Sequence, residues 1–298
     1  MTLQLPTLSP GARIGVFAPS GIFSPERLEA GIAVVEGWGY EVVRGPALEG
    51  KHRYLAGTDD ERLEGLNWAL TSPDLDGCWM ARGGYGISRL LDRVLWEQVV
   101  ARPVLGFSDG TALHTALYKA CGQASIHSPV LHSLADHVDS GSREYLRSLL
   151  DGSSAGPLYG RLLLKGREAL PVVGPLVGGN LCMLASLCGT RWQLNAAGCI
   201  LFLEDVAEPP YRVDRLLQQL KMSGVLDGVL GVAVGSLLGC EAPEGSDWRQ
   251  EDLIRDHLEE LGVPVLVGLP VGHGATNLAF VHGGVVRLEE EGLVPIRG

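Results

Sequence analysis

The segment 106–110 carries the pattern most suited to covalent chemistry. It reads Gly-Phe-Ser-Asp-Gly, which fits the G-x-S-x-G turn that exposes a serine where a buried strand passes into a helix. The N–H that follows Ser108 would point outward at a helix N-terminus, where it can stabilise an oxyanion. Serine, aspartate and threonine also cap helices, and we expect Asp109 and Thr111 to do so. The motif alone therefore leaves Ser108 as either a nucleophile or a cap.

A nucleophilic serine needs a general base, and His273 is the strongest candidate among the eight histidines. It follows an apolar run and stands between two glycines, so it has little to pack against. A histidine in a surface loop is the alternative interpretation. His127, His132 and His137 are spaced five apart, which does not place them on one helical face for metal binding. We therefore expect no metal site.

The base needs an acid to orient it, and Glu204 and Asp205 follow an apolar run directly. Burying an unpaired carboxylate is costly, so at least one of the two needs a partner. A salt bridge from Asp205 to Arg212 or Arg215 is the structural alternative. The order serine, acid, histidine is also that of the α/β-hydrolases, but no lead-in of antiparallel strands and no HGGG-type segment precedes the serine.

Short apolar strands alternate with helical segments in the first half of the chain. We expect strands at 12–18, 40–45, 76–84 and 102–108, with helices at 25–39, 59–73, 87–94 and 109–122. This alternation predicts a parallel, doubly wound α/β sheet. Ligands bind at the carboxyl ends of the strands in such sheets, and Ser108 and the turn 82–86 both fall there.

The second half begins after a segment rich in glycine, serine and proline. We therefore expect a domain at 1–150, a connection at 151–170 and a second domain at 171–298. The second domain is predicted to hold helices at 178–190, 211–224 and 246–262. Strands are predicted at 199–205, 229–239 and 263–272, with short strands and turns over 277–296.

Composition limits the classes of function. The 298 residues are 46% apolar and 20% charged, with a net charge of −11, which argues against a nucleic-acid partner. We see no signal peptide and no apolar run long enough to span a bilayer. The six cysteines are scattered and form no C-x-x-C pair, as is usual in a reducing compartment. We expect a cytoplasmic protein without membrane attachment.

Six segments in order resemble the LD-carboxypeptidase family of serine peptidases, which includes the microcin-immunity peptidases. The resemblance runs from about residue 12 to about residue 290. The segments are ARGGYGISRLL (81–91), GFSDGTALH (106–114), IHSP (126–129), GGNLCMLASLCGT (178–190), ILFLEDVAEPPYRVDRLLQQL (200–220) and GLPVGHGATN (268–277). The resemblance implies a flavodoxin-like N-terminal domain, a smaller β-rich C-terminal domain, a homodimer and no cofactor.

The same resemblance implies a catalytic triad of Ser108, Glu204 and His273. It also implies an oxyanion hole from the backbone N–H of Asp109 and of a glycine in the turn, Gly83 or Gly84. The implied substrate is a murein tetrapeptide, from which terminal D-alanine is removed at an L,D peptide bond. Arg82 is placed in the sequence to bind the free carboxylate of such a peptide, or to form a structural salt bridge.

Two departures from the family pattern and two alternative functions stay open. The common His-Gly-Pro is His127-Ser128-Pro129 here, and "AFVHG" stands at 279–283 in place of a proline-containing segment. One alternative is cleavage of a peptidyl- or aminoacyl-nucleotide, for which Tyr159 and Trp192 could stack on a base. The other is a non-catalytic binding module whose turn 82–86 cradles a phosphate or flavin, although the turn matches neither G-x-G-x-x-G nor a P-loop.

Overall fold

The computed structural model describes residues 6–153, 156–167 and 169–296, and they form two compact units. The N-terminal unit contains the described residues up to 153 together with 278–281. The C-terminal unit contains 156–277 and 282–296. The expected domain at 171–298 therefore differs from the structure at 278–281, which group with the N-terminal unit.

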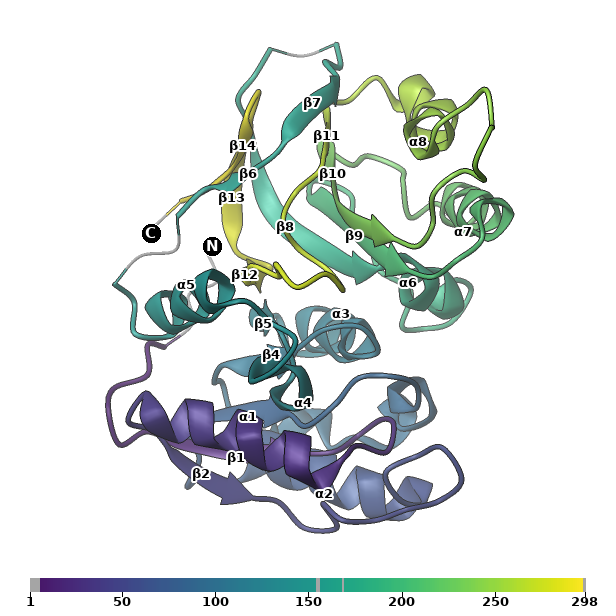
Figure 1. The fold of residues 1–298 in the computed structure, drawn as a ribbon. Helices are drawn as coiled ribbons and strands as arrows, with labels where there is room; N and C mark the ends of the chain where they lie inside the picture. Colours follow the sequence, from purple (N-terminus) through teal and green to yellow (C-terminus); the bar gives the residue numbers. More distant parts are fainter. Residues whose placement is uncertain (1–5, 154–155, 168, 297–298) are drawn as a thin grey trace. The chain divides into compact units, whose positions relative to one another are not determined.

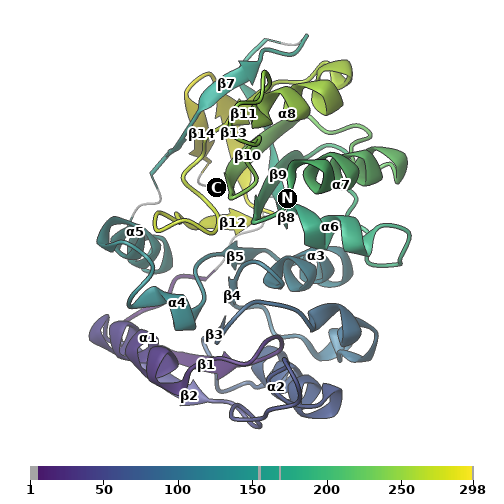
Figure 2. The same ribbon diagram turned by 45° about the vertical axis from the view of Figure 1, so that its right-hand side comes forward.

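The sheet of the N-terminal unit has the strand order β12-β5-β4-β3-β1-β2 (Figures 1 and 2). Neighbouring strands among β1 to β5 are parallel. The order 2-1-3-4-5 is that of the flavodoxin-like doubly wound sheet, so the predicted fold class is confirmed. The strands are β1 (Arg13–Phe17), β2 (Glu41–Arg44), β3 (Gly77–Met80), β4 (Val104–Gly106), β5 (Ser125–His127) and β12 (Phe280–His282).

Helices cover both faces of this sheet, with α1, α4 and α5 on one face and α2 and α3 on the other (Figure 2). Ser24 and Pro25 begin α1, and the side chains of Thr58 and Glu61 form a capping box at α2. The helices are α1 (Pro25–Gly37), α2 (Asp59–Thr71), α3 (Gly110–Cys121), α4 (Leu131–Leu134) and α5 (Ser140–Leu150). The helix expected at 87–94 is wrong in type: short 3₁₀ turns stand there, η1 (Ile87–Arg89) and η2 (Leu91–Arg93), followed by η3 (Trp96–Gln98).

The sheet of the C-terminal unit has eight strands in the order β6-β14-β13-β8-β9-β10-β11-β7. The four central strands β8 to β11 are parallel, and the flanking strands run antiparallel to their neighbours. The strands are β6 (Leu158–Tyr159), β7 (Arg161–Leu164), β8 (Val172–Asn180), β9 (Ile200–Val206), β10 (Gly231–Leu238), β11 (Val265–Val267), β13 (Val285–Glu289) and β14 (Gly292–Pro295). This is the β-rich architecture expected for the second half.

Helices α6 (Leu181–Leu187), α7 (Pro210–Met222) and α8 (Gln250–Leu258) lie along one side of that sheet (Figure 1), and the turn η4 (Glu259–Leu261) follows α8. Two expectations differ from the structure here. The segment 151–170 is more than a connection, because it contains the two edge strands of the sheet. β6 pairs with β14 at one edge, and β7 pairs with β11 at the other. The long strand β8 was not predicted, since Pro175 and the pair Gly178–Gly179 interrupt its apolar pattern.

Candidate active site

Ser108 stands at a sharp turn between β4 and α3. Its φ of 59° lies in the left-handed region, which a residue other than glycine adopts only at an energetic cost. Both glycines of the motif lie close to the side chain of Met80 in β3. A Cβ on Gly106 would lie 2.4 Å from the Sδ of Met80, and one on Gly110 would lie 2.9 Å from the same atom. The G-x-S-x-G pattern therefore has a local cause, which is a close approach of the turn to β3.

The glycine-rich turn after β3 lies beside the serine. A Cβ on Gly83 would be 2.9 Å from the Cβ of Ser108 and 3.1 Å from its Oγ, so only glycine fits there. Gly84 has a φ of +111°, which also favours glycine. The carbonyl of Gly83 accepts a hydrogen bond from the N–H of Gly21 at 3.1 Å. The structure thus brings Ser108 and the candidate oxyanion glycines together within one unit.

Asp109 corrects an expectation. It occupies the position before α3, but its side chain makes no capping hydrogen bond. Its Oδ2 instead accepts a hydrogen bond from Ser20 Oγ at 2.5 Å and another from the N–H of Ile87 at 2.9 Å. The carboxyl group is fully buried, and burial raises its pKa. The helix cap predicted at this residue is wrong for its side chain.

Glu204 and His273 meet within the C-terminal unit. Glu204 is fully buried in β9, and its Oε2 lies 2.7 Å from the Nδ1 of His273 in the loop after β11. The side chain of His273 is 18% exposed. The carboxylate therefore fixes the orientation of the imidazole ring through Nδ1.

The loop that carries His273 is held by backbone contacts. Gly272 adopts a φ of +136°, and a Cβ there would lie 3.0 Å from Glu204 Oε2. Its N–H donates to Asn277 Oδ1 at 3.0 Å, and the carbonyl of Val271 accepts from the N–H of Ser236 at 2.8 Å. The glycine before the histidine therefore allows the imidazole to approach the carboxylate.

Burial and charge act in opposite directions on the imidazole. Burial alone would lower the pKa of His273, but the hydrogen bond and the charge of Glu204 outweigh it, with a smaller contribution from Asp205. The net effect is a pKa raised above the ordinary value of a histidine. An acid that stabilises the imidazolium in this way is what a general base at a nucleophile requires.

Asp205 faces different partners from those expected. Its Oδ1 accepts from Asn180 Nδ2 at 3.0 Å, and its Oδ2 accepts from the N–H of Cys182 at 2.9 Å, at the start of α6. Arg212 pairs instead with Glu208, and the guanidinium of Arg215 lies over the ring of Tyr211. The alternative of a salt bridge from Asp205 to either arginine is therefore wrong. Asp205 therefore hydrogen-bonds the first turn of α6, whereas Glu204 contacts His273.

Arg82 is exposed, and its guanidinium donates to the carbonyl of Ile22. In the described part of the chain it makes no ion pair with a carboxylate, so the structural salt bridge weighed for it does not form. Tyr159 is 64% exposed on β6, whereas Trp192 is buried. Burial leaves Trp192 a poor platform for a nucleotide base.

The first departure from the family pattern, His127-Ser128-Pro129, lies next to the turn that carries Ser108, which we call the elbow. The N–H of Ser128 donates to the carbonyl of Gly106 at 2.9 Å, and the ring of His127 stacks on Phe280 with 4.8 Å between centroids. Phe280 belongs to the second departure and is also buried. Ser128, His127 and Phe280 are therefore parts of the core of the N-terminal unit.

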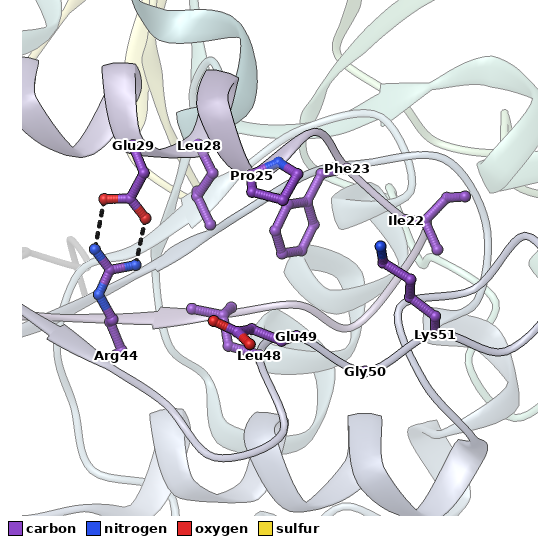
Figure 3. Close-up of a pocket in the computed structure, with 10 residues that line it drawn as sticks. All are labelled: Ile22, Phe23, Pro25, Leu28, Glu29, Arg44, Leu48, Glu49, Gly50 and Lys51. Atoms are coloured by element: carbon purple, nitrogen blue, oxygen red, sulfur yellow. Dashed lines mark hydrogen bonds and ion pairs between the residues drawn. The ribbon is translucent and has the colours of Figure 1, made fainter.

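A cavity of about 230 Å³ lies between α1 and the segments that follow β1 and β2 in the N-terminal unit (Figure 3). Ile22, Phe23, Leu28 and Leu48 give it apolar walls, and the Lys51 amine points into it. The Arg44 guanidinium at its other end is paired with both carboxylate oxygens of Glu29 at 2.6 Å. Because the Ile22 carbonyl also holds Arg82, the wall of the cavity is bonded to the glycine-rich turn.

Within the described ranges, no three or more His, Cys, Asp or Glu side chains are grouped so that they could hold a metal ion. Of the helices seen in those ranges, none is long and apolar enough to cross a membrane.

Comparison with known proteins places this arrangement in a family. Residues 14–128 match the LD-carboxypeptidase N-terminal domain, and residues 173–288 match the LD-carboxypeptidase C-terminal domain. A putative carboxypeptidase of Synechocystis is 40% identical over 291 residues, covering 96% of this chain and 94% of the relative. The murein tetrapeptide carboxypeptidase of Pseudomonas aeruginosa is 36% identical over 291 residues, covering 93% of each chain.

A solved structure shows the same fold. The microcin C7 self-immunity protein in its wild-type apo state superposes with a TM-score of 0.87 at 23% identity, covering 99% of this chain and 98% of that one. The two domain matches and the 40% identity extend the likeness from fold to family, which argues against a non-catalytic binding module. The chain belongs to the LD-carboxypeptidase family and is a serine peptidase.

Proposed function

We propose that this enzyme releases terminal D-alanine from murein tetrapeptides by cleaving the bond between an L-centre and the D-residue. The observation that carries the proposal is the left-handed φ of Ser108 at a strand-to-helix turn with Gly83 against its Oγ. A helix cap would not need that strained conformation. The substrate class rests on the 36% identical relative that is named a murein tetrapeptide carboxypeptidase.

The proposed mechanism is acyl transfer through Ser108, Glu204 and His273. The Oγ of Ser108 attacks the carbonyl carbon of the scissile amide while Nε2 of His273 accepts the hydroxyl proton. The hydrogen bond from His273 Nδ1 to Glu204 holds the ring and stabilises the imidazolium. His273 then protonates the leaving nitrogen, D-alanine departs, and water hydrolyses the ester on Ser108 with His273 again as the base.

The negative charge on the tetrahedral intermediate would be held by backbone donors. We assign this role to the N–H of Asp109, at the start of α3, and to the turn that contains Gly83 and Gly84. Preorganised donors of this kind each lower the barrier by about 3–4 kcal/mol. Arg82 would bind the carboxylate of the terminal D-alanine, since its charge is exposed and its partner in the structure is a neutral carbonyl.

The proposal includes a homodimer that acts in the cytoplasm. The dimer rests on the family resemblance, and the location rests on the scattered cysteines, which form no C-x-x-C pair. Light scattering coupled to gel filtration would test the dimer, which predicts twice the 31.7 kDa chain mass. Fractionation of the producing cells would test the location.

The deciding experiment is hydrolysis of L-Ala-γ-D-Glu-meso-diaminopimelyl-D-Ala and of its L-Lys counterpart, with Ser108→Ala beside the parent. Release of D-alanine by the parent alone is the expected result. Release by both proteins would exclude Ser108 as the nucleophile. Release by neither would overturn the murein substrate, and aminoacyl-adenylates would then be tried as substrates.

A further inference from the structure

Three loops meet beside Ser108 at the carboxyl edge of the N-terminal sheet, and buried polar side chains bond them together. The loops are the segment after β1 (18–24), the turn after β3 (82–87) and the elbow itself. We propose that Asp109 is a positioning residue that ties the first two loops to the elbow and so holds the glycine-rich turn beside Ser108. This inference rests on the proposed function and goes beyond it, because that function uses only the backbone N–H of Asp109.

The contacts of Asp109 support this role. A single oxygen, Oδ2, accepts from Ser20 Oγ in the first loop and from the N–H of Ile87 at the end of the second. Ser20 and Asp109 are both fully buried, so each bond is shielded from water. Because Asp109 follows Ser108 directly in the chain, these two bonds fix both loops relative to the nucleophile.

Arg62 closes the same network from α2. Its guanidinium is fully buried and donates to the carbonyl of Pro19 in the first loop and to that of Gly86 in the second, the latter at 3.0 Å. Its other nitrogen pairs with Asp59 at 2.5 Å. The loops are thus bridged twice, once by Asp109 and once by Arg62.

A direct backbone bond completes the connection. The N–H of Gly21 donates to the carbonyl of Gly83, the glycine that touches the Oγ of Ser108. Movement of the segment 18–24 would therefore move the candidate oxyanion turn. A carboxylate taken out of water is costly unless it is hydrogen-bonded, so its place here needs a compensating role.

The test compares Asp109→Ala, which removes both bonds, with Asp109→Asn, which keeps an acceptor oxygen of the same shape. Hydrogen exchange of the segments 18–24 and 82–87 reads the tether without any substrate. We expect faster exchange in both segments for Asp109→Ala and parent-like exchange for Asp109→Asn. Asp76→Ala is the matched control, because Asp76 accepts from the N–H of Arg13 at the opposite edge of the same sheet.

Kinetics on the tetrapeptide supply the second measurement. Misplaced oxyanion donors act on the transition state, so kcat is expected to fall about 10²-fold in Asp109→Ala with KM little changed, and Asp109→Asn should restore it. Ser20→Ala, which removes one of the two bonds, should give an intermediate loss and serves if Asp109→Ala does not fold.

Two results would overturn the inference. One is unchanged exchange in both segments when the bonds are removed, and the other is a loss in Asp109→Asn as large as in Asp109→Ala. A parent enzyme that releases no D-alanine contradicts the proposed substrate instead. The exchange comparison still decides the tether in that case.

Discussion

Among single residues, the pair of Glu204 and His273 makes a sharp prediction about pH. In the proposed mechanism the neutral imidazole of His273 accepts the proton, so kcat/KM should rise with pH through the pKa of His273. Burial lowers the pKa of His273, whereas Glu204 raises it. Glu204→Gln should therefore move the rising limb of the pH–rate profile to lower pH. We also expect kcat to fall by about 10⁴-fold, as when other triads lose the charge of their acid. A pH–rate profile of both proteins measures the two effects.

Asp214→Asn is the control for this profile. Asp214 pairs with a different imidazole, that of His257, at 2.8 Å. Its loss should leave the limb where the parent has it. A rising limb that stays in place in Glu204→Gln would belong to another group.

The raised pKa of His273 also contributes to the free energy of unfolding. This contribution is fully present below the pKa of the unfolded histidine and is lost as the pH rises through the folded pKa.

The identities of the candidate residues could be predicted from the sequence, but not all of their partners. Ser108 and His273 stand in local contexts, a glycine-flanked turn and a glycine-flanked loop, that are visible in a few residues. The role of Asp109 depends on Ser20, which lies 89 positions away along the chain. Its position before a helix indicated a cap, and tertiary contacts took the side chain elsewhere.

Among the elements, α1 allows a prediction in which the same substitution, glycine to alanine, changes the free energy of unfolding in opposite directions at two positions. A Cβ on Gly31 would lie 2.0 Å from the carbonyl oxygen of Leu131 in α4. Gly31→Ala should force the two helices apart and lower the free energy of unfolding by about 1–3 kcal/mol. Gly37→Ala, with open space around it at the end of the same helix, should raise it by up to about 1 kcal/mol. Urea unfolding midpoints of the two variants test both signs.

A gain in stability for Gly31→Ala would mean that α1 and α4 are not in close contact. The slope of the urea transition should stay constant in both variants, because neither changes the surface exposed on unfolding.

Elements with strong local signals were the ones that the sequence predicted well. The helices predicted from residues 25 and 59 begin in the structure at Pro25 and Asp59. The strand β8 was not predicted because its glycines interrupt the apolar pattern of a strand. One of them, Gly178, is needed because β8 packs closely against β9. A Cβ on Gly178 would lie 2.2 Å from the carbonyl oxygen of Phe202, a contact that a local pattern does not reveal.

In the molecule as a whole, two units were expected, yet the path of the chain between them was not. Residues 278–281 follow the loop of His273 but group with the N-terminal unit, where β12 extends the sheet beside β5. Pairing of this kind joins residues from the two halves of the chain. No periodicity within a short window contains that information.

The position of β12 in the N-terminal sheet leads to a prediction about which unit a substitution destabilises. Phe280 is 5% exposed and stacks on His127, so Phe280→Ala should remove about 3–5 kcal/mol of packing from the N-terminal unit. Hydrogen exchange should accelerate in β4 and β5 and not in β9 and β10.

Phe202→Ala, at a fully buried position in β9, is the reciprocal control and should accelerate β9 and β10 instead. Acceleration confined to β9 and β10 in Phe280→Ala would contradict the assignment of 278–281. Because β5 leads into Ser128, whose N–H bonds the carbonyl of Gly106, loosening by Phe280→Ala should also reach the turn that holds Ser108. Phe280 would then affect the order of the turn that carries the candidate nucleophile, although it lies far from Ser108 along the chain.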